Sequence, residues 1–285
     1  MDLAYDATYA AFRDEVRDFL RTHRDRMPKR FGHRPTDEQI AWQTLLIEHG
    51  YAARTIPEAY GGHGAEPDIL KSRIIAEAFA EAGAPGGLAN QGISMLVPTL
   101  LELGTEAQKT ALIPPTLRGE LVWCQGYSEP GAGSDLASLT TRGEDDGENF
   151  LINGQKIWTS TAHAADMIFC LVRTEPDSPK HEGISYLIFS MKTPGIEVRP
   201  LLTMTGAAEF NEVFFTDVKV PNTQIVGGRG QGWFVANATL KHERGMLGDP
   251  NAAHARLQAI IEILKTETLD GQRLMDHPLY LDRLM

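Results

Sequence analysis

Apolar residues recur at helical spacing over most of the first 120 residues. Three stripes stand out: Phe12, Val16 and Phe19-Leu20; Ile40 and Leu45 to Ile47; and Ile69, Ile74-Ile75 and Phe79. Intervals of three and four residues predict amphipathic helices. Thr36 with Gln39, and Thr105 with Gln108, have the residue types of capping boxes at helix starts. The pattern predicts an N-terminal all-α domain over residues 1–120.

The pattern changes to short apolar runs after residue 121. Runs rich in Val, Ile and Phe are separated by Gly, Pro, Asn or Asp, as is typical of strands, and cover 121–123, 150–152, 155–159, 167–172, 184–191, 196–201 and 213–220. Asn153-Gly154 lies between two of these runs and predicts a tight hairpin turn. Strands without intervening helices predict a middle antiparallel β-sandwich or barrel over residues 121–228.

Helical spacing returns after the glycine-rich run at 227–232. The next apolar face, with intervals of three and four, consists of Trp233, Ala236, Leu240, Glu243 and Leu247. A second helix, with Leu257, Ile260-Ile261 and Leu264, is expected to start at Asp249-Pro250. The predicted fold class is therefore α+β multidomain, with a partial C-terminal helical bundle over residues 229–285.

Composition excludes several classes of protein. The 285 residues are 42% hydrophobic and 23% charged, which is typical of a globular chain and not of a disordered one. The formal net charge of -11 opposes binding to nucleic acid or to an anionic membrane. No apolar run approaches the ~18 residues of a membrane span. Met1 to Asp6 lacks the features of a signal peptide, so a cytoplasmic protein is expected.

Cysteine and histidine usage predicts neither a metal site nor a disulfide framework. Cys124 and Cys170 both lie in apolar runs, which favours buried free thiols in a reducing compartment, although one disulfide stays open. The nine histidines are scattered, and none has zinc-like spacing with a cysteine.

The run from Cys124 to Asp135 carries the most chemical information. Gly131 and Gly133 let backbone N–H groups approach a ligand, while Ser128 and Ser134 offer hydroxyls. Such a loop suits an anion, especially a phosphate, although a plain surface turn is the alternative. A Rossmann fingerprint is excluded because Leu136 stands where its third glycine would be, and no βαβ pattern follows. Glu129, before Pro130, is expected to hold the loop.

Four segments, in order, resemble the acyl-CoA dehydrogenase family of flavoproteins. They are 56–62 (Ile-Pro-Glu-Ala-Tyr-Gly-Gly, with Ile where the family has Trp), 127–135 (Tyr-Ser-Glu-Pro-Gly-Ala-Gly-Ser-Asp), 153–160 (Asn-Gly-Gln-Lys-Ile-Trp-Thr-Ser) and 212–221 (Glu-Val-Phe-Phe-Thr-Asp-Val-Lys-Val-Pro). The resemblance implies a helical domain, a β domain and a C-terminal four-helix domain. It also implies FAD between the last two.

The resemblance implies which residues contact FAD: Gln125, Tyr127, Ser128, Gly133, Ser134, Trp158, Thr159 and Ser160. Ser128 and Ser134 would bind the flavin and its pyrophosphate. Trp158 would pack on the isoalloxazine, and Ser160 would place a hydroxyl near flavin N5, where the family commonly has Thr. An ordinary core aromatic is the alternative for Trp158.

Glu243 is the candidate base because a carboxylate on an apolar helix face is costly unless it is partnered or neutral. Some family members have their catalytic glutamate at this position, in a Glu-Arg pair like Glu243-Arg244, and others have it later than residue 285. The resemblance implies that Arg244 helps to orient the site. A structural carboxylate and a solvated arginine are the respective alternatives. His163, His242 and Asp135 have no spacing that supports catalysis.

The implied reaction is FAD-dependent α,β-dehydrogenation of an acyl-CoA thioester, with α-proton abstraction by the glutamate and hydride transfer to flavin N5. An electron-transfer flavoprotein or similar acceptor and a homo- or hetero-oligomer are implied as partners. The alternatives are a non-catalytic flavin-binding or assembly subunit, and a flavin oxidase or monooxygenase. The family's later Arg-x-x-Phe-Gly and Gly-Gly-x-Gly segments have no counterpart here, so an incomplete C-terminal domain with an exposed apolar face is expected.

Overall fold

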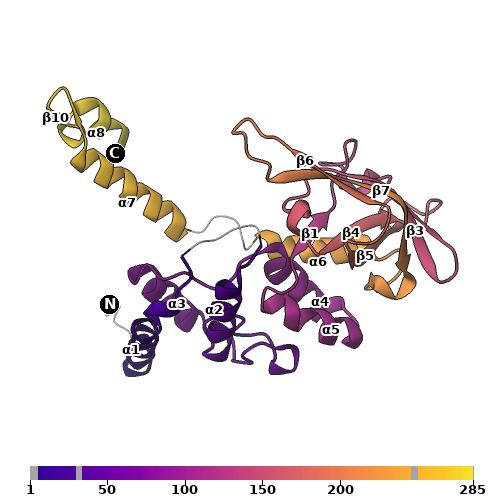
Figure 1. Cartoon of the computed structure of the whole chain (residues 1–285), viewed down its shortest axis with the longest axis horizontal. Coiled ribbons are helices and arrows are strands. Elements are labelled where there is room, and N and C mark those ends of the chain that lie inside the picture. The colour runs from indigo at the N-terminus through magenta and orange to yellow at the C-terminus, as the bar shows by residue number, and fades with distance from the viewer. Residues whose placement is uncertain (1–5, 30–33, 245–249, 285) are drawn as a thin grey trace. The chain divides into compact units, whose positions relative to one another are not determined.

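The computed structural model of the protein describes residues 6–29, 34–244 and 250–284 (Figure 1). The chain divides into two compact units, Met1–His242 and Glu243–Met285. The first unit holds the N-terminal helices and the β-sheet. The division into three domains at residues 120 and 228 stays a prediction.

The N-terminal part is helical, as expected. Its elements are α1 (Ala7–Thr22), η1 (Arg24–Arg26), α2 (Asp37–Glu48), η2 (Glu58–Tyr60), α3 (Ile69–Glu81), the π-helical turn η3 (Gly92–Leu96), α4 (Val97–Leu103) and α5 (Glu106–Leu117). Both capping boxes are confirmed: the Thr36 hydroxyl accepts from the Gln39 N–H, and the Thr105 hydroxyl accepts from the Gln108 N–H. Each box supplies partners to backbone N–H groups that a helix start leaves unpaired.

The apolar stripes of α1, α2 and α3 form one hydrophobic cluster. Val16, Leu46 and Ile74 are fully buried in it, and the ring of Phe19 meets the edge of Tyr51 at 4.8 Å between centroids. Ile69 is the exception to the predicted stripe, because it is the first residue of α3 and its side chain is 86% exposed. Helical spacing gives the face of a residue, but it does not show whether the first turn reaches the core.

The middle part is one sheet of eight strands, β1 (Trp123–Gly126), β2 (Arg142–Asp145), β3 (Asn149–Lys156), β4 (Met167–Arg173), β5 (Ile184–Ser190), β6 (Ile196–Leu201), β7 (Phe210–Pro221) and β8 (Ile225–Val226). The strand order is β6-β7-β3-β2-β4-β5-β8, with β1 beside β4. Most pairs are antiparallel, as predicted, but β1 and β2 each run parallel to β4. Short turns η4 (Leu136–Ser138), η5 (Ala162–Ala164) and η6 (Asn222–Gln224) connect the strands.

The predicted hairpin turn at Asn153-Gly154 is wrong, because β3 runs straight through these residues. The register of β3 against β7 shifts between Ile152 and Gly154, which marks a β-bulge. Gly154 has a φ of 151°, and a Cβ there would lie 2.5 Å from the Thr141 hydroxyl oxygen. The side-chain oxygen of Asn153 accepts a hydrogen bond from the Asp217 backbone N–H at 3.0 Å. Glycine is needed at this position because Thr141 approaches the backbone closely. The Asn-Gly pair alone does not distinguish this requirement from that of a hairpin turn.

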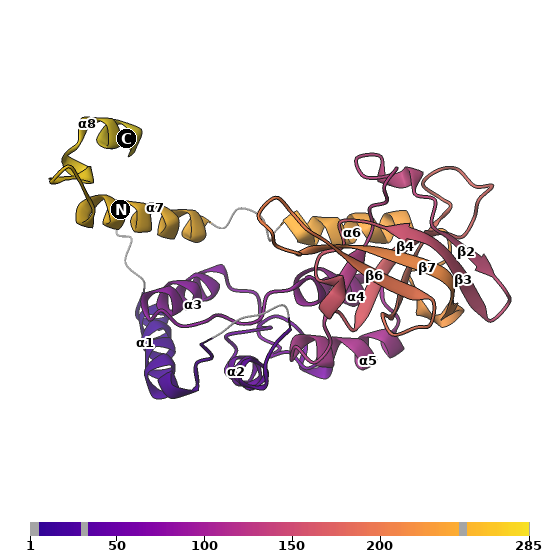
Figure 2. The same ribbon diagram turned by 45° about the horizontal axis from the view of Figure 1, so that its top comes forward.

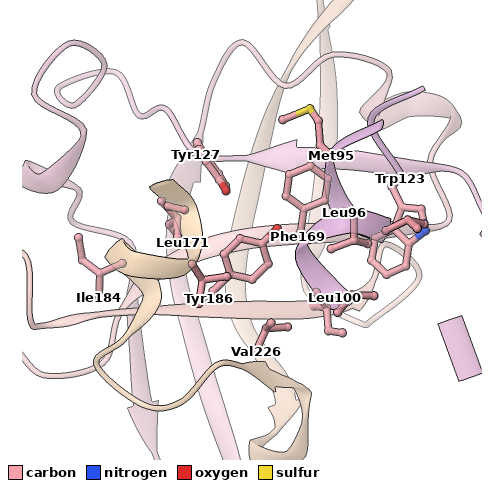
Figure 3. Packing of buried hydrophobic residues seen from close by; sticks show 14 of the residues in the cluster. Met95, Leu96, Leu100, Trp123, Tyr127, Phe169, Leu171, Ile184, Tyr186 and Val226 are labelled. Atoms are coloured by element: carbon pink, nitrogen blue, oxygen red, sulfur yellow. The ribbon is translucent and has the colours of Figure 1, made fainter. Parts of the chain in front are cut away.

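Strand β4 is buried on both faces, which explains its continuous apolar run. Ile168, Cys170 and Val172 face a cluster between the two halves of the curled sheet, where Phe189 of β5 and Phe215 of β7 meet at 5.9 Å. The residues of the other face, Phe169 and Leu171, join a second cluster with α4, α5 and α6 (Gly232–Arg244). Figures 1 and 2 show these helices beside the sheet, and Figure 3 shows the second cluster at close range.

The prediction of buried free thiols is confirmed. Cys124 and Cys170 are free and fully buried. Burial raises the pKa of the Cys170 thiol to about 12, so this group is not a thiolate near neutral pH.

Helix α6 is attached to the first unit by buried contacts. Val235 and Ala236 are fully buried in the cluster with the sheet. The Thr239 and Thr99 hydroxyls lie 3.0 Å apart, and the Thr239 hydroxyl lies 3.4 Å from that of Tyr186. These hydrogen bonds join α6 to both α4 and β5.

The second unit contains α7 (Pro250–Thr266), the strand pair β9 (Thr268–Leu269) and β10 (Gln272–Arg273), η7 (Leu274–Asp276) and α8 (Pro278–Leu284). Helix α7 begins at Pro250, as predicted, whereas Leu247 and Asp249 lie outside the described residues. An apolar face of α7 is open, since Leu257, Ile260 and Ile263 are 43–54% exposed. None of the helices in the described ranges has the length and apolar character needed to cross a membrane.

Gly92 generates a testable prediction for the packing between η3 and the sheet. A Cβ at this position would lie 2.5 Å from Cδ1 of Trp123, whose indole N–H is held by the Thr116 hydroxyl at 2.8 Å. Gly92→Ala is expected to lower the free energy of unfolding by about 1–3 kcal/mol in urea titrations, because the indole cannot move aside. Gly86→Ala is the control, as no atom lies within 4 Å of its Cβ. Equal stability of the two variants would contradict the prediction.

Candidate flavin site

The loop after β1 forms a tight turn with an open tip. Glu129 and Ala132 exchange two backbone hydrogen bonds, of 2.9 and 3.0 Å. Gly131 and Gly133 are exposed, and no atom lies within 4 Å of the position that a Cβ would take on either residue. Ser134 is also exposed. The tip therefore leaves its backbone accessible to a ligand, as the sequence suggested.

Tyr127 lies at the root of this loop with its side chain in the core. The ring is 5% exposed and meets the edges of Phe169 and Tyr186 at 6.0 and 6.3 Å. Figure 3 shows it pointing toward these two rings. The side chain of Tyr127 is thus part of the core, and its predicted contact with the cofactor stays a prediction.

A buried ion pair lies beneath the loop. The Lys156 ammonium, at the end of β3, donates to Glu129 Oε1 at 2.8 Å and to the Tyr127 carbonyl at 3.1 Å. The Glu129 carboxylate also accepts from the N–H groups of Thr140 and Thr141, at 2.7 and 2.9 Å, and from the Thr140 hydroxyl at 2.8 Å. The side chains of Lys156 and Glu129 are only 0% and 4% exposed. The expectation that Glu129 holds the loop is confirmed.

The charge state of this pair follows from its contacts. Burial alone would raise the pKa of the Glu129 carboxyl. The Lys156 ammonium and hydrogen bonds from Lys156, Thr141 and Thr140 outweigh burial and lower this pKa to about 2. The carboxylate is therefore ionised at every pH at which the protein is expected to work.

Trp158, two residues after Lys156, points away from the core. Its side chain is 60% exposed, and its ring meets the edge of Phe210 at 5.9 Å. Its φ of 59° lies in the left-handed region, which a bulky residue rarely adopts. The backbone thus presents a large apolar surface to its surroundings instead of burying it.

Thr159 and Ser160 continue this segment beside β7. The Thr159 carbonyl accepts from the backbone and side-chain N–H groups of Asn211, at 3.0 and 2.9 Å. Thr159 is 1% exposed, yet its hydroxyl has no hydrogen-bond partner among the described residues. A buried hydroxyl without a partner is costly, and a bound ligand could remove that cost. Ser160 is half-buried.

The structure brings the loop and the Trp158 segment together. The Ile157 N–H donates to the Ser128 carbonyl at 2.9 Å, so the two predicted cofactor-binding segments are direct neighbours. Ser128 is half-buried, as is Gln125 on β1.

Glu243 and Arg244 are the last two residues of α6. Glu243 is half-buried and Arg244 is exposed. On the same helix face, Ala236 is fully buried and Leu240 packs on the core, so the predicted spacing holds as far as residue 244. The neighbouring His242 has a structural partner, because its Nε2 lies 3.0 Å from Oε1 of Glu102.

Comparison with known proteins identifies the family. Residues 6–120 match the model of the acyl-CoA dehydrogenase N-terminal domain, and residues 124–218 match that of the middle domain. The chain belongs to the acyl-CoA dehydrogenase family. The family is one of oxidoreductases that act on CH–CH donors, and its cofactor is FAD.

Individual relatives agree with this assignment. The chain is 41% identical over 256 residues to acyl-CoA dehydrogenase IpdE1 of Mycobacterium tuberculosis, covering 88% of this chain and 64% of IpdE1. It is 47% identical over 230 residues to FadE34 of the same species, covering 80% of this chain and 32% of FadE34. The chain thus spans less than two thirds of either relative.

Solved structures share the whole fold. The Tcur3481–Tcur3483 steroid ACAD superposes with a TM-score of 0.75 at 32% identity, covering 100% of this chain and 72% of that one. The ChsE4–ChsE5 complex of Mycobacterium tuberculosis gives the same TM-score and identity, covering 100% of this chain and 74% of that one.

The residues on the site fit the cofactor of the family. The open glycine tip suits a pyrophosphate, the exposed indole suits a planar ring, and the unpartnered Thr159 hydroxyl suits a polar ligand atom. Within the described part of the chain, no three His, Cys, Asp or Glu side chains gather as a metal site would require.

Two residues of this site escaped the sequence analysis, Lys156 and Asn211. Lys156 could have been found from the sequence, since it lies an even number of positions after the buried residues Phe150 and Ile152 of β3 and so shares their face of the strand. A lysine on a buried face requires a buried partner for its charge. Asn211, fully buried on β7, had no comparable signal.

The Glu129 pKa predicts a distinctive pH dependence. Glu129 ionises more readily in the folded protein, with a pKa of about 2 against an ordinary 4.5, so its stabilising contribution is full above pH 4.5 and is lost as pH falls toward 2. The shift corresponds to about 3 kcal/mol. Glu129→Gln is expected to be destabilised by about 3–5 kcal/mol near pH 7, because it leaves Lys156 unpaired. In urea titrations, this difference from wild type should shrink as pH is lowered below 4.5.

Glu144→Gln is the matched control for this experiment. Glu144 pairs with Arg142 at 3.0 Å, but both side chains are more than 60% exposed. Its effect on stability should stay below about 1 kcal/mol at every pH. A Glu129→Gln difference that is constant with pH would show that the carboxylate does not titrate as described.

Proposed function

We propose that this chain binds FAD and performs the α,β-dehydrogenation of an acyl-CoA thioester. The observation that carries the proposal is the Trp158–Ser160 segment, which presents an exposed indole next to a buried hydroxyl without a partner among the described residues. Family membership supplies the reaction class, and this segment supplies a reason for the chain itself to hold a flavin.

The roles of the binding residues follow from their exposure. The backbone N–H groups around Gly131 and Gly133 would hold the pyrophosphate, with hydroxyls from Ser128 and Ser134. The Trp158 indole would cover one face of the ring system, and the Thr159 and Ser160 hydroxyls would bind its polar edge. FAD supplies the hydride acceptor, a function that no side chain can perform.

Glu243 is the proposed base. It lies in the last turn of α6 and is half-buried. In this proposal it removes the α proton of the thioester as hydride leaves the β carbon. Arg244, which is exposed, would assist by orienting the thioester end of the substrate.

The relatives support a narrower substrate class and a partner. One structural neighbour is a steroid ACAD, and another is a complex of two components, ChsE4 and ChsE5. We infer a steroid-derived acyl-CoA as the substrate and a second chain as an assembly partner. An electron-transfer flavoprotein or a similar acceptor would reoxidise the protein.

An assembly subunit without its own catalysis is the second candidate. The two-component neighbour favours it, since that structure is a complex of two components, ChsE4 and ChsE5. Exchange of the substrate α proton by the wild-type chain on its own distinguishes the first candidate from this one.

Trp158→Ala should weaken FAD binding without destabilising the fold. Loss of an indole–ring contact of about 1–1.5 kcal/mol is expected to raise the Kd for FAD about tenfold, measured by fluorescence titration. The free energy of unfolding should hardly change, because the indole is 60% exposed. Ile69→Ala, at an 86% exposed side chain of α3, is the control and should leave the Kd unchanged. A Kd within twofold of wild type in Trp158→Ala would remove Trp158 from the site.

Glu243→Gln should stop α-proton abstraction. The rate of exchange of the α proton of a steroid-derived acyl-CoA with solvent deuterium, followed by NMR, is expected to fall by about 10²–10⁴-fold. FAD content should stay at the wild-type value. Glu262→Gln serves as the control, because Glu262 is exposed on α7 and paired with Lys265 at 2.8 Å. Unchanged exchange in Glu243→Gln would remove Glu243 as the base, and the absence of exchange in the wild-type chain would favour the assembly subunit.

A further inference from the structure

The buried pair of Glu129 and Lys156 joins three stretches of chain that are distant in sequence. Lys156 is the last residue of β3 and lies 27 positions after Glu129. Its ammonium bonds both the Glu129 carboxylate and the Tyr127 carbonyl, so it holds the loop at a side chain and at the backbone. The same carboxylate binds Thr140 and Thr141, where the chain enters β2.

These bonds surround the contact between the two cofactor-binding segments. Ser128, between the two loop residues that Lys156 binds, accepts from the Ile157 N–H at 2.9 Å. Ile157 in turn lies between Lys156 and Trp158. A change in the Lys156 position therefore moves the loop and the indole relative to each other.

The pair has more hydrogen bonds than a simple fold-stabilising contact needs. A buried ion pair can often be replaced by apolar side chains with little loss of stability. An apolar pair at 129 and 156 would leave the Tyr127 carbonyl and the Thr140 and Thr141 N–H groups without their present partners. What the charged pair supplies is a defined geometry for the loop.

We propose that Glu129 and Lys156 are positioning residues for the flavin, which fix the turn at 128–133 against the segment at 157–160. The inference rests on the proposed function, because it assigns these segments to FAD. Both side chains are buried, and their polar atoms are already bonded within the protein, unlike the Thr159 hydroxyl, so both act through the loop and through Trp158. The pair sets the affinity for FAD and the surroundings of its ring.

The test separates positioning from stability with one single and one double variant of the full chain. Glu129→Gln is expected to raise the Kd for FAD at least tenfold and to change the visible circular dichroism of the bound flavin. The double variant Glu129→Gln/Lys156→Met removes the unpaired ammonium and should regain most of the stability lost in the single variant. It should still bind FAD at least tenfold more weakly than wild type, with an altered visible spectrum.

The control is Glu144→Gln, which removes a carboxylate from an exposed pair on the neighbouring strand β2 and should leave both readouts unchanged. Recovery of both stability and FAD affinity in the double variant would overturn the inference while leaving the proposed function intact. A folded Glu129→Gln variant that binds FAD with wild-type affinity would also overturn the inference and leave the proposed function intact. A wild-type protein that binds no FAD would reject the proposed function, and this inference with it.

Discussion

The arrangement of the site depends on one desolvated contact, the ion pair between Glu129 and Lys156. Removing two charges from water costs several kcal/mol per ion, and their attraction offsets this only when the remaining hydrogen bonds are satisfied. Here the carboxylate has four donors and the ammonium has two acceptors. The energetic requirement of the pair thus dictates where the loop, the start of β2 and the end of β3 can lie.

The sheet contains a strand, β4, that is buried on both faces. β4 supplies alternate side chains to two clusters, one within the curled sheet and one against α4, α5 and α6. A strand buried on both faces is rigid, so the segments that follow it and its neighbours are held in fixed positions. The loop at 127–134 and the segment at 157–160 extend from this rigid part.

Local structure could be predicted from the sequence where its causes are local. Both capping boxes and the apolar spacing of α6 involve residues within one or two helical turns, and the structure confirms them. The prediction of a hairpin at Asn153-Gly154 failed for the opposite reason, since the demand for glycine comes from Thr141, thirteen positions earlier in the chain. The burial of the Tyr127 side chain likewise could not be predicted from local sequence. Its ring partners, Phe169 and Tyr186, are distant in sequence.

Three departures from low-energy structure gather at adjacent residues. Trp158 has a left-handed backbone and a mostly exposed indole, and Thr159 has a buried hydroxyl without a described partner. The left-handed backbone and the unpartnered hydroxyl each cost on the order of 1–3 kcal/mol, and each persists only because the surroundings enforce it. Asn211 and the Ser128–Ile157 hydrogen bond supply that enforcement. Proteins concentrate such departures at functional sites, where a ligand compensates for them. The physical case for a ligand at this segment therefore does not depend on the family, although both lead to the same residues.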